Sequence, residues 1–164
     1  MTSYHILMNM LLSFTSAFGF GIITNVPKRS LVPSGTIGMI VWIVYHGLSL
    51  TLPNSLVLPN LMGGLIIGLL AHAYGSHYHV SSNVVAIPAM VSLVPGSGAY
   101  EAMKLLITPN HSAYAAHAQF HNVFVVAVSI TIGFFLAEFF ILMLGKINHS
   151  QVKSIIDETW RRLL

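Results

Sequence analysis

The chain has 164 residues, of which 55% are apolar and only 7% carry a charge. A soluble domain averages about 25% charged residues, because polar groups must cover its large hydrated surface. The composition therefore excludes a soluble globular enzyme and a disordered segment. The formal net charge of +3 is too small for a nucleic-acid partner, and the absence of cysteine excludes disulfides and Cys-ligated zinc. The class that remains is an integral membrane protein.

Five apolar runs between turn signals are long enough to cross a bilayer, which takes about 20 residues in a helix. They lie at residues 4–24, 34–52, 55–73, 84–107 and 122–145. None shows the alternation of barrel strands, and helices are the other fold that satisfies every backbone group in lipid. The predicted fold class is therefore all-α, a polytopic membrane protein with about five transmembrane helices.

The segment after the fifth span has a different pattern. Between Ser150 and Leu164 apolar residues recur at helical spacing, and charged residues occupy the other faces. This segment is too short and too charged to cross a membrane. We expect a five-helix transmembrane domain over residues 1–149 and a cytoplasmic amphipathic helix over residues 150–164. That helix lies on the membrane surface or docks on a partner chain.

The positive residues predict an orientation. Lys28 and Arg29 lie between the first two spans, and four more lysines and arginines follow the fifth. Only Lys104 lies elsewhere, inside the end of the fourth span. Since lysine and arginine favour cytoplasmic loops, we expect an N-out, C-in, multi-pass protein of the cytoplasmic membrane of the cell.

The fourth span is interrupted near its middle by the segment 94–98, Val-Pro-Gly-Ser-Gly. Proline removes a backbone donor and glycine relaxes the helix, so the pattern predicts a broken helix. Backbone groups freed at membrane depth are tolerated where they are buried in protein or line a water-filled cavity. Transporters bind solutes at such breaks, whereas a proline kink packed against other helices is the alternative. The candidate substrate-binding residues are Ser92, Pro95, Gly96, Ser97, Gly98 and Tyr100.

Two acidic residues are candidates for proton coupling. Glu138 lies within the apolar fifth span, where an ionised side chain costs roughly 2.5–3.5 kcal/mol. A functional role is therefore favoured over a structural, hydrogen-bonded glutamate. Glu101 is the second candidate, although Lys104 stands three residues on and can pair with it on one helix face.

Nine histidines raise the question of a metal site. His117 and His121 share one helix face, but the expected topology puts them across the membrane from the three histidines between residues 72 and 79. We therefore expect no metal and no cofactor. An intramembrane serine protease is disfavoured because Pro95 stands where its Gly-x-Ser-Gly motif needs glycine.

Two motifs resemble hallmarks of the threonine/serine exporter family. One is the segment 25–31, Asn-Val-Pro-Lys-Arg-Ser-Leu, and the other is the segment 93–100, Leu-Val-Pro-Gly-Ser-Gly-Ala-Tyr. The resemblance extends over residues 10–145 and concerns the carboxy-terminal membrane module of that family. Ser92 departs from it, since the family often has a proline there, while this chain has Pro88 instead. This departure changes the sequence at the break, so it affects the expected substrate more than the expected fold.

The resemblance implies a non-enzymatic, proton-driven exporter of small polar metabolites. Threonine and serine are the named substrates, and a branch split into two chains is associated with succinate-type dicarboxylates. The family has about ten helices, so the expected partner is a second five-helix membrane subunit of the same family, or a further copy of this chain. Asn25, Pro27 and Arg29 become candidates for the gate at the cytoplasmic mouth. A non-transporting scaffold subunit and a passive channel stay open as alternatives.

Overall fold

The computed structural model describes the backbone of residues 3–107 and 113–163, and the side chains of residues 4–107 and 114–144. All regular structure in these ranges is helical. The six helices are α1 (Ser3–Ile23), α2 (Lys28–Thr51), α3 (Val57–Tyr78), α4 (Asn83–Met90), α5 (Gly96–Ile107) and α6 (Ala113–Leu163). Within the described residues α1, α2, α3 and α6 are long and apolar enough to cross a membrane. The predicted class, an all-α polytopic membrane protein, is confirmed.

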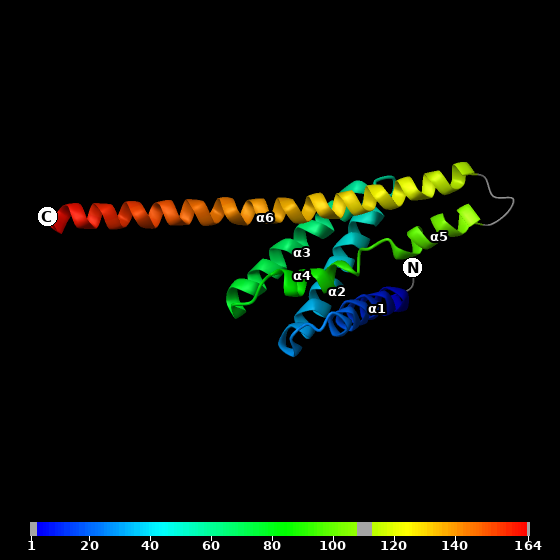
Figure 1. Ribbon diagram of the computed structural model, residues 1–164, viewed down its shortest axis with the longest axis horizontal. Helices are drawn as coiled ribbons and strands as arrows, with labels where there is room; N and C mark the ends of the chain where they lie inside the picture. Colours follow the sequence, from blue (N-terminus) through cyan, green and yellow to red (C-terminus); the bar gives the residue numbers. More distant parts are fainter. Residues whose placement is uncertain (1–2, 108–112, 164) are drawn as a thin grey trace.

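The predicted break in the fourth span is also confirmed. Its first half is α4 and its second half is α5, with a non-helical connection between Met90 and Gly96. At 1.5 Å per residue the two halves are about 12 Å and 18 Å long, so neither half is long enough to cross a bilayer by itself. Figure 1 shows the chain bending between α4 and α5.

Helix α2 begins at Lys28, six residues before the span expected from the sequence, and includes Pro33. A proline at this position cannot donate to the carbonyl of Arg29, four residues earlier. The hydroxyl of Tyr74 in α3 donates to that carbonyl at 3.0 Å instead. A side chain from a distant helix thus satisfies the carbonyl that the proline leaves free, which local sequence patterns do not reveal.

Two other helices extend beyond the expected spans. Helix α3 continues through the polar residues to Tyr78, where His79 ends it in a left-handed conformation with φ of 53°. Helix α6 begins at Ala113 and continues to Leu163 without interruption at residue 150, as Figure 1 shows. Residues 150–163 are therefore the last part of α6, and their place on a membrane surface stays a prediction.

Helices α3 and α6 run parallel and pack closely through glycines. A Cβ added to Gly64 would overlap the carbonyl of Ile130, and one added to Gly133 would overlap the carbonyl of Leu61. Each glycine therefore lets its own helix touch the backbone of the other. Small residues at helix interfaces allow this approach in membranes, as the sequence pattern Gly64-x-x-x-Gly68 predicts.

The small residues of α1 pack against α2 and the end of α4. Ser13 donates from its hydroxyl to the carbonyl of Gly38 at 2.9 Å, and Ala17 lies against the same glycine. Small side chains thus fill the inside of the bundle, while large apolar side chains such as Leu11, Phe124 and Phe135 are exposed on its outside. This distribution suits a lipid solvent.

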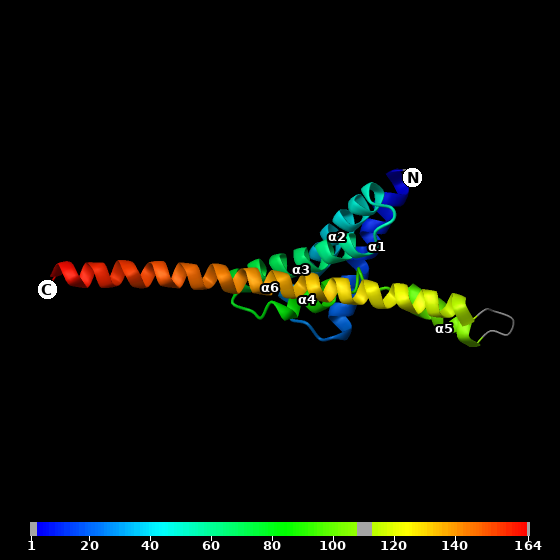
Figure 2. The same cartoon turned by 90° about the horizontal axis from the view of Figure 1, so that it is seen from above.

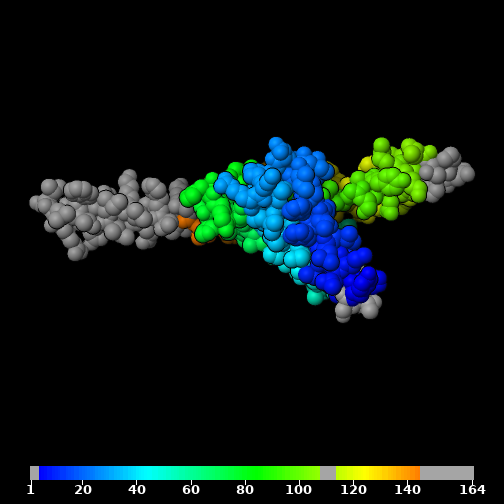
Figure 3. Space-filling view, turned by 90° about the horizontal axis from the view of Figure 1, so that it is seen from below, coloured from blue at the N-terminus to red at the C-terminus, as the bar shows by residue number. Residues whose placement is uncertain are grey.

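The helices form a body from which one hairpin projects. In Figure 2, α1 and α2 cross α6, and Figure 3 shows α5 and the start of α6 extending from the body. The α1–α2 turn lies beside α4 at one end of the body, because residues from both line one cavity. The break between α4 and α5 lies between that end and the hairpin.

Candidate functional site

A cavity of about 380 Å³ lies at the break between α4 and α5. The break contributes the stretch from Ser92 to Pro95, and the first turn of α5 contributes Ser97 and Gly98. The other walls come from the second half of α2, the start of α3 and the start of α6. The volume falls in the range of pockets for small molecules, about 300–1,000 Å³.

The backbone at the break leaves hydrogen-bond donors at the start of α5. The amide of Gly96 donates to the carbonyl of Val94 at 2.8 Å, and the amide of Ala99 donates to the carbonyl of Pro95 at 3.0 Å. Ser97 and Gly98 lie between these two residues, and their backbone amides have no hydrogen-bond partner among the described residues. First-turn amides of a helix point out of its amino end, which here borders the cavity.

Gly98 brings α6 against the start of α5. A Cβ at this position would lie 3.2 Å from Cγ2 of Val123 and 3.6 Å from Nε2 of Gln119. Nothing lies within 4 Å of a Cβ added to Gly96. Of the two glycines in the motif, Gly98 is therefore the one that sets the spacing between helices.

Ser92 anchors the end of the α4 segment to α1 and α2. Its hydroxyl donates to the carbonyl of Ser13 at 3.3 Å, and its Oγ lies 2.6 Å from the position that a Cβ on Gly38 would take. The same Gly38 carbonyl accepts the hydroxyl of Ser13. Three helices thus meet at small residues directly beside the cavity.

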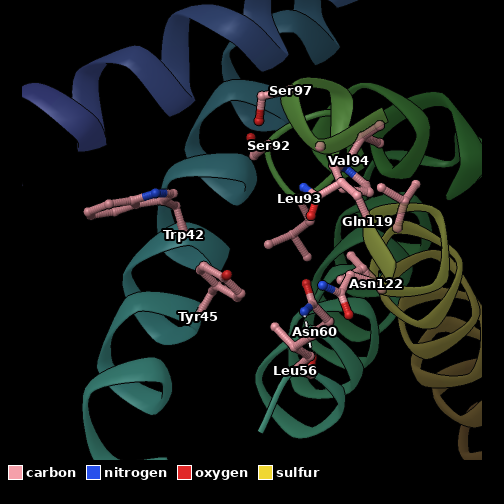
Figure 4. Close-up of a pocket in the computed structure, with 14 residues that line it drawn as sticks. Trp42, Tyr45, Leu56, Asn60, Ser92, Leu93, Val94, Ser97, Gln119 and Asn122 are labelled. Carbon is pink, nitrogen blue, oxygen red and sulfur yellow. Dashed lines mark hydrogen bonds between the residues drawn. The ribbon is translucent and has the colours of Figure 1, made fainter. Parts of the chain in front are cut away.

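Neutral amide side chains give the cavity its polar lining. Asn60 comes from the first turn of α3, and Gln119 and Asn122 come from α6. Figure 4 shows Asn60 and Asn122 projecting into the same space below the break. The sequence reasoning missed these residues because it searched the spans for ionisable groups. A polar amide directly after Pro59 in an apolar run was the available signal.

Two aromatic side chains of α2, Trp42 and Tyr45, also line the cavity. In Figure 4 the Tyr45 ring lies nearer to Asn60, while the Trp42 indole extends away from it. The ring of Trp42 stacks on that of His46, with centroids 4.9 Å apart and planes at 10°. This stacking fixes the orientation of the indole.

Of the six predicted substrate-binding residues, Ser92, Pro95, Ser97 and Gly98 line this cavity. Gly96 and Tyr100 are not among its lining residues, and the Tyr100 side chain is 70% exposed. The break therefore brings four candidates together around the cavity, while the other two lie outside its lining.

The predicted gate residues lie at the other end of the bundle. Asn25 and Pro27 line a separate cavity of about 320 Å³, whose far wall includes Asn83 and Pro88 of α4. Arg29 is exposed and does not line it. Its backbone carbonyl accepts the Tyr74 hydroxyl, so the motif that contains it is tied to α3.

The two acidic candidates occupy different surroundings. Glu138 is half-buried in an apolar groove of about 640 Å³ formed along α6 by residues such as Phe135 and Phe139. It lies about 24 Å beyond Asn122 along the helix, at 1.5 Å per residue. Glu101 is exposed but nearer, since Nε2 of the cavity residue Gln119 donates to its Oε2 at 3.4 Å.

A polar cavity at a broken helix, surrounded by helices that can cross a membrane, is the architecture of a membrane transporter. Residues 9–140 match the family model described as threonine/serine exporter, ThrE. The chain therefore belongs to the threonine/serine exporter family, and the resemblance predicted from its two motifs is confirmed. No solved structure matches the chain.

Proposed function

We propose that this chain is a membrane subunit of a secondary transporter that exports small polar metabolites across the cytoplasmic membrane. The observation that carries the proposal is the cavity at the break between α4 and α5. It combines free helix amides, hydroxyls and amide side chains within an otherwise apolar bundle, which is how discontinuous helices hold solutes in transporters. Threonine and serine are the substrates we propose, with succinate-type dicarboxylates as the alternative.

The rival functions are a scaffold subunit and a passive channel. A scaffold has no use for a polar cavity inside the membrane, because packing alone would fill that space with apolar side chains. A channel needs no titrating acid, whereas Glu101 touches a cavity residue and Glu138 lies in the apolar part of α6. These features favour an exporter coupled to protons, with Glu138 and Glu101 as its coupling residues.

A partner is part of the proposal. A single set of five spans encloses little of an alternating-access path, and transporter halves are often inverted repeats. We propose a second five-helix subunit of the same family, or a further copy of this chain, in an assembly whose subunits begin on opposite sides. This chain would then be N-out and C-in, with Asn25, Pro27 and Arg29 at the cytoplasmic mouth.

The test is export from proteoliposomes that contain the chain with its partner and are loaded with labelled L-threonine. Export should follow an imposed pH gradient. The double variant Pro95→Ala, Gly96→Ala favours a continuous helix by about 3 and 1 kcal/mol at the two positions, so it should close the break. Position 96 has room for the added methyl group. We expect normal insertion and a loss of export of roughly tenfold or more, because the binding groups are displaced.

The matched control is Pro53→Ala, which removes an exposed proline from the α2–α3 turn and should leave export unchanged. Gradient-driven export at the wild-type rate in the double variant would show that the break is a packing feature only. A wild-type chain that exports nothing with its partner would support the scaffold.

A further inference from the structure

The side chain of Asn60 has one free hydrogen-bonding group, and its orientation is fixed. The side chain is 2% exposed, and its Nδ2 donates to the carbonyl of Leu56 at 2.7 Å. A carbonyl can only accept, so the nitrogen must face Leu56 and Oδ1 must face the other way. Figure 4 shows the oxygen turned away from Leu56 and into the cavity.

Oδ1 of Asn60 has no hydrogen-bond partner among the described residues. Among the described side chains this oxygen does not count as a fully buried unpaired atom, so it is reached from the cavity and its hydrogen-bond donor must come from there. An acceptor at the inner wall of a cavity, with no donor from the protein, points to a donor supplied by a ligand. The residue is built into the first turn of α3 and held there by its own backbone contact.

The opposite polarity is found at the start of α5. This helix has 12 residues, and its amino end carries the free amides of Ser97 and Gly98. Free amides and the helix dipole favour a negative group there. In Figure 4 Ser97 lies above the break and Asn60 lies below it. The residues that line this cavity include no lysine, arginine, aspartate or glutamate, so its lining is neutral, and Glu101 lies at its edge on the side of Gln119.

We propose that Asn60 binds the ammonium group of an α-amino acid whose carboxylate lies at the amino end of α5. The proposal rests on the proposed transport function and names the residue that selects the substrate. An ammonium group supplies the donor that Oδ1 lacks, and the carboxylate meets the free amides of Ser97 and Gly98. A dicarboxylate would instead bring its second carboxylate against a carbonyl oxygen, which repels it.

Trp42 provides a direct binding signal, because it lines the cavity and the chain has two tryptophans, Trp42 and Trp160. In the full chain carrying Trp160→Phe, reconstituted in vesicles, the emission therefore reports Trp42 alone. Four compounds are titrated: L-threonine, 3-hydroxybutyrate without the ammonium group, 1-amino-2-propanol without the carboxylate, and succinate. We expect threonine to bind more tightly than the other three.

Asn60→Leu removes the amide and keeps the number and branching of the side-chain heavy atoms. We expect the affinity for threonine to fall on the order of tenfold or more, as for other hydrogen bonds to charged groups. The affinity for 3-hydroxybutyrate should not change. Asn60→Asp keeps an oxygen and adds a negative charge, so it should strengthen binding of 1-amino-2-propanol and weaken that of 3-hydroxybutyrate. A merely structural role cannot produce these opposite shifts.

The matched control is Asn83→Leu, since Asn83 is an exposed amide that lines the separate cavity near the α1–α2 turn. It should leave all four affinities unchanged. Two results would overturn the role of Asn60 and leave the proposed transport function intact. One is an equal loss of affinity for threonine and 3-hydroxybutyrate in Asn60→Leu. The other is wild-type binding of succinate as tight as that of threonine. A chain that neither binds nor exports any of these compounds with its partner would overturn the proposed function as well.

Discussion

Two stretches of the same helix, α6, border very different spaces. Near its start Gln119 and Asn122 face a polar cavity that also contains Asn60 and the free amides of α5. Further along, Glu138 lies in an apolar groove formed by large side chains of α6 itself. In our proposal, solute recognition is therefore assigned to neutral groups where a neighbouring helix is broken. The charged residue lies instead on an intact part of the bundle, about 24 Å away along the helix axis.

The contact between α3 and α6 separates these two stretches. Gly64 and Gly133 each lie against the backbone of the other helix, so neither helix can shift there without losing the contact. The cavity lies on one side of this contact and Glu138 on the other. If proton binding at Glu138 affects the cavity, the effect must pass through this rigid pair of helices.

The largest expected effect comes from removing that contact. Gly133→Ala places a methyl group against the Leu61 carbonyl and should lower the free energy of unfolding by about 1–3 kcal/mol, as overpacked cores do. Thermal unfolding in detergent measures this. Gly19→Ala is the matched control, because nothing lies within 4 Å of its added Cβ. It should be neutral or stabilising by up to about 1 kcal/mol, since alanine favours the helix. Equal stability of the two variants would contradict the close packing of α3 and α6.

The next effect concerns Glu138. Glu138→Gln preserves size and hydrogen bonding but removes the titrating proton, so expression and threonine binding should be normal. Export driven by a pH gradient should fall by roughly tenfold or more, while threonine exchange at equal pH persists, because exchange moves no net proton. Glu138→Asp should retain part of the activity. Gradient-driven export at the wild-type level in Glu138→Gln would assign this residue a structural role.

A smaller effect is expected at Glu101. Glu101→Gln replaces a charged acceptor for Gln119 by a neutral one at the edge of the cavity. The bond is long and exposed, so threonine affinity should change by less than about fivefold, the equivalent of 1 kcal/mol. Trp42 emission and export rates measure it. If Glu101→Gln abolishes gradient dependence while Glu138→Gln does not, the coupling residue lies at the cavity.

The sequence predicts the large features of this protein because they depend on local composition. Apolar length predicts the spans, and the Pro-Gly-Ser-Gly segment predicts the break between α4 and α5. Small residues spaced by four predict the faces that pack, as Gly64 and Ser13 do. Each of these signals is carried by neighbouring residues and needs no tertiary contact.

What the sequence does not predict depends on distant contacts. The expected second span begins at residue 34, after Pro33, whereas α2 includes this proline and Tyr74 satisfies the Arg29 carbonyl that it leaves free. Asn60 becomes a candidate only once its oxygen is seen to be unpaired, which depends on the direction of its amide. Tyr100 adjoins the predicted motif, yet it lies outside the lining of the cavity. Side-chain direction and long-range partners therefore limited the prediction.

The parallel pairing of α3 and α6 also sets the order in which the protein can assemble during synthesis. Gly133 leaves the ribosome 69 residues after Gly64. At about 5–20 residues per second, α3 waits roughly 3–14 s for the helix that covers it. During that time Asn60 lacks the wall that α6 later provides. The cavity is therefore among the last parts of the chain to form, and a ribosome pause between α4 and α6 would prolong the exposure of Asn60 to lipid.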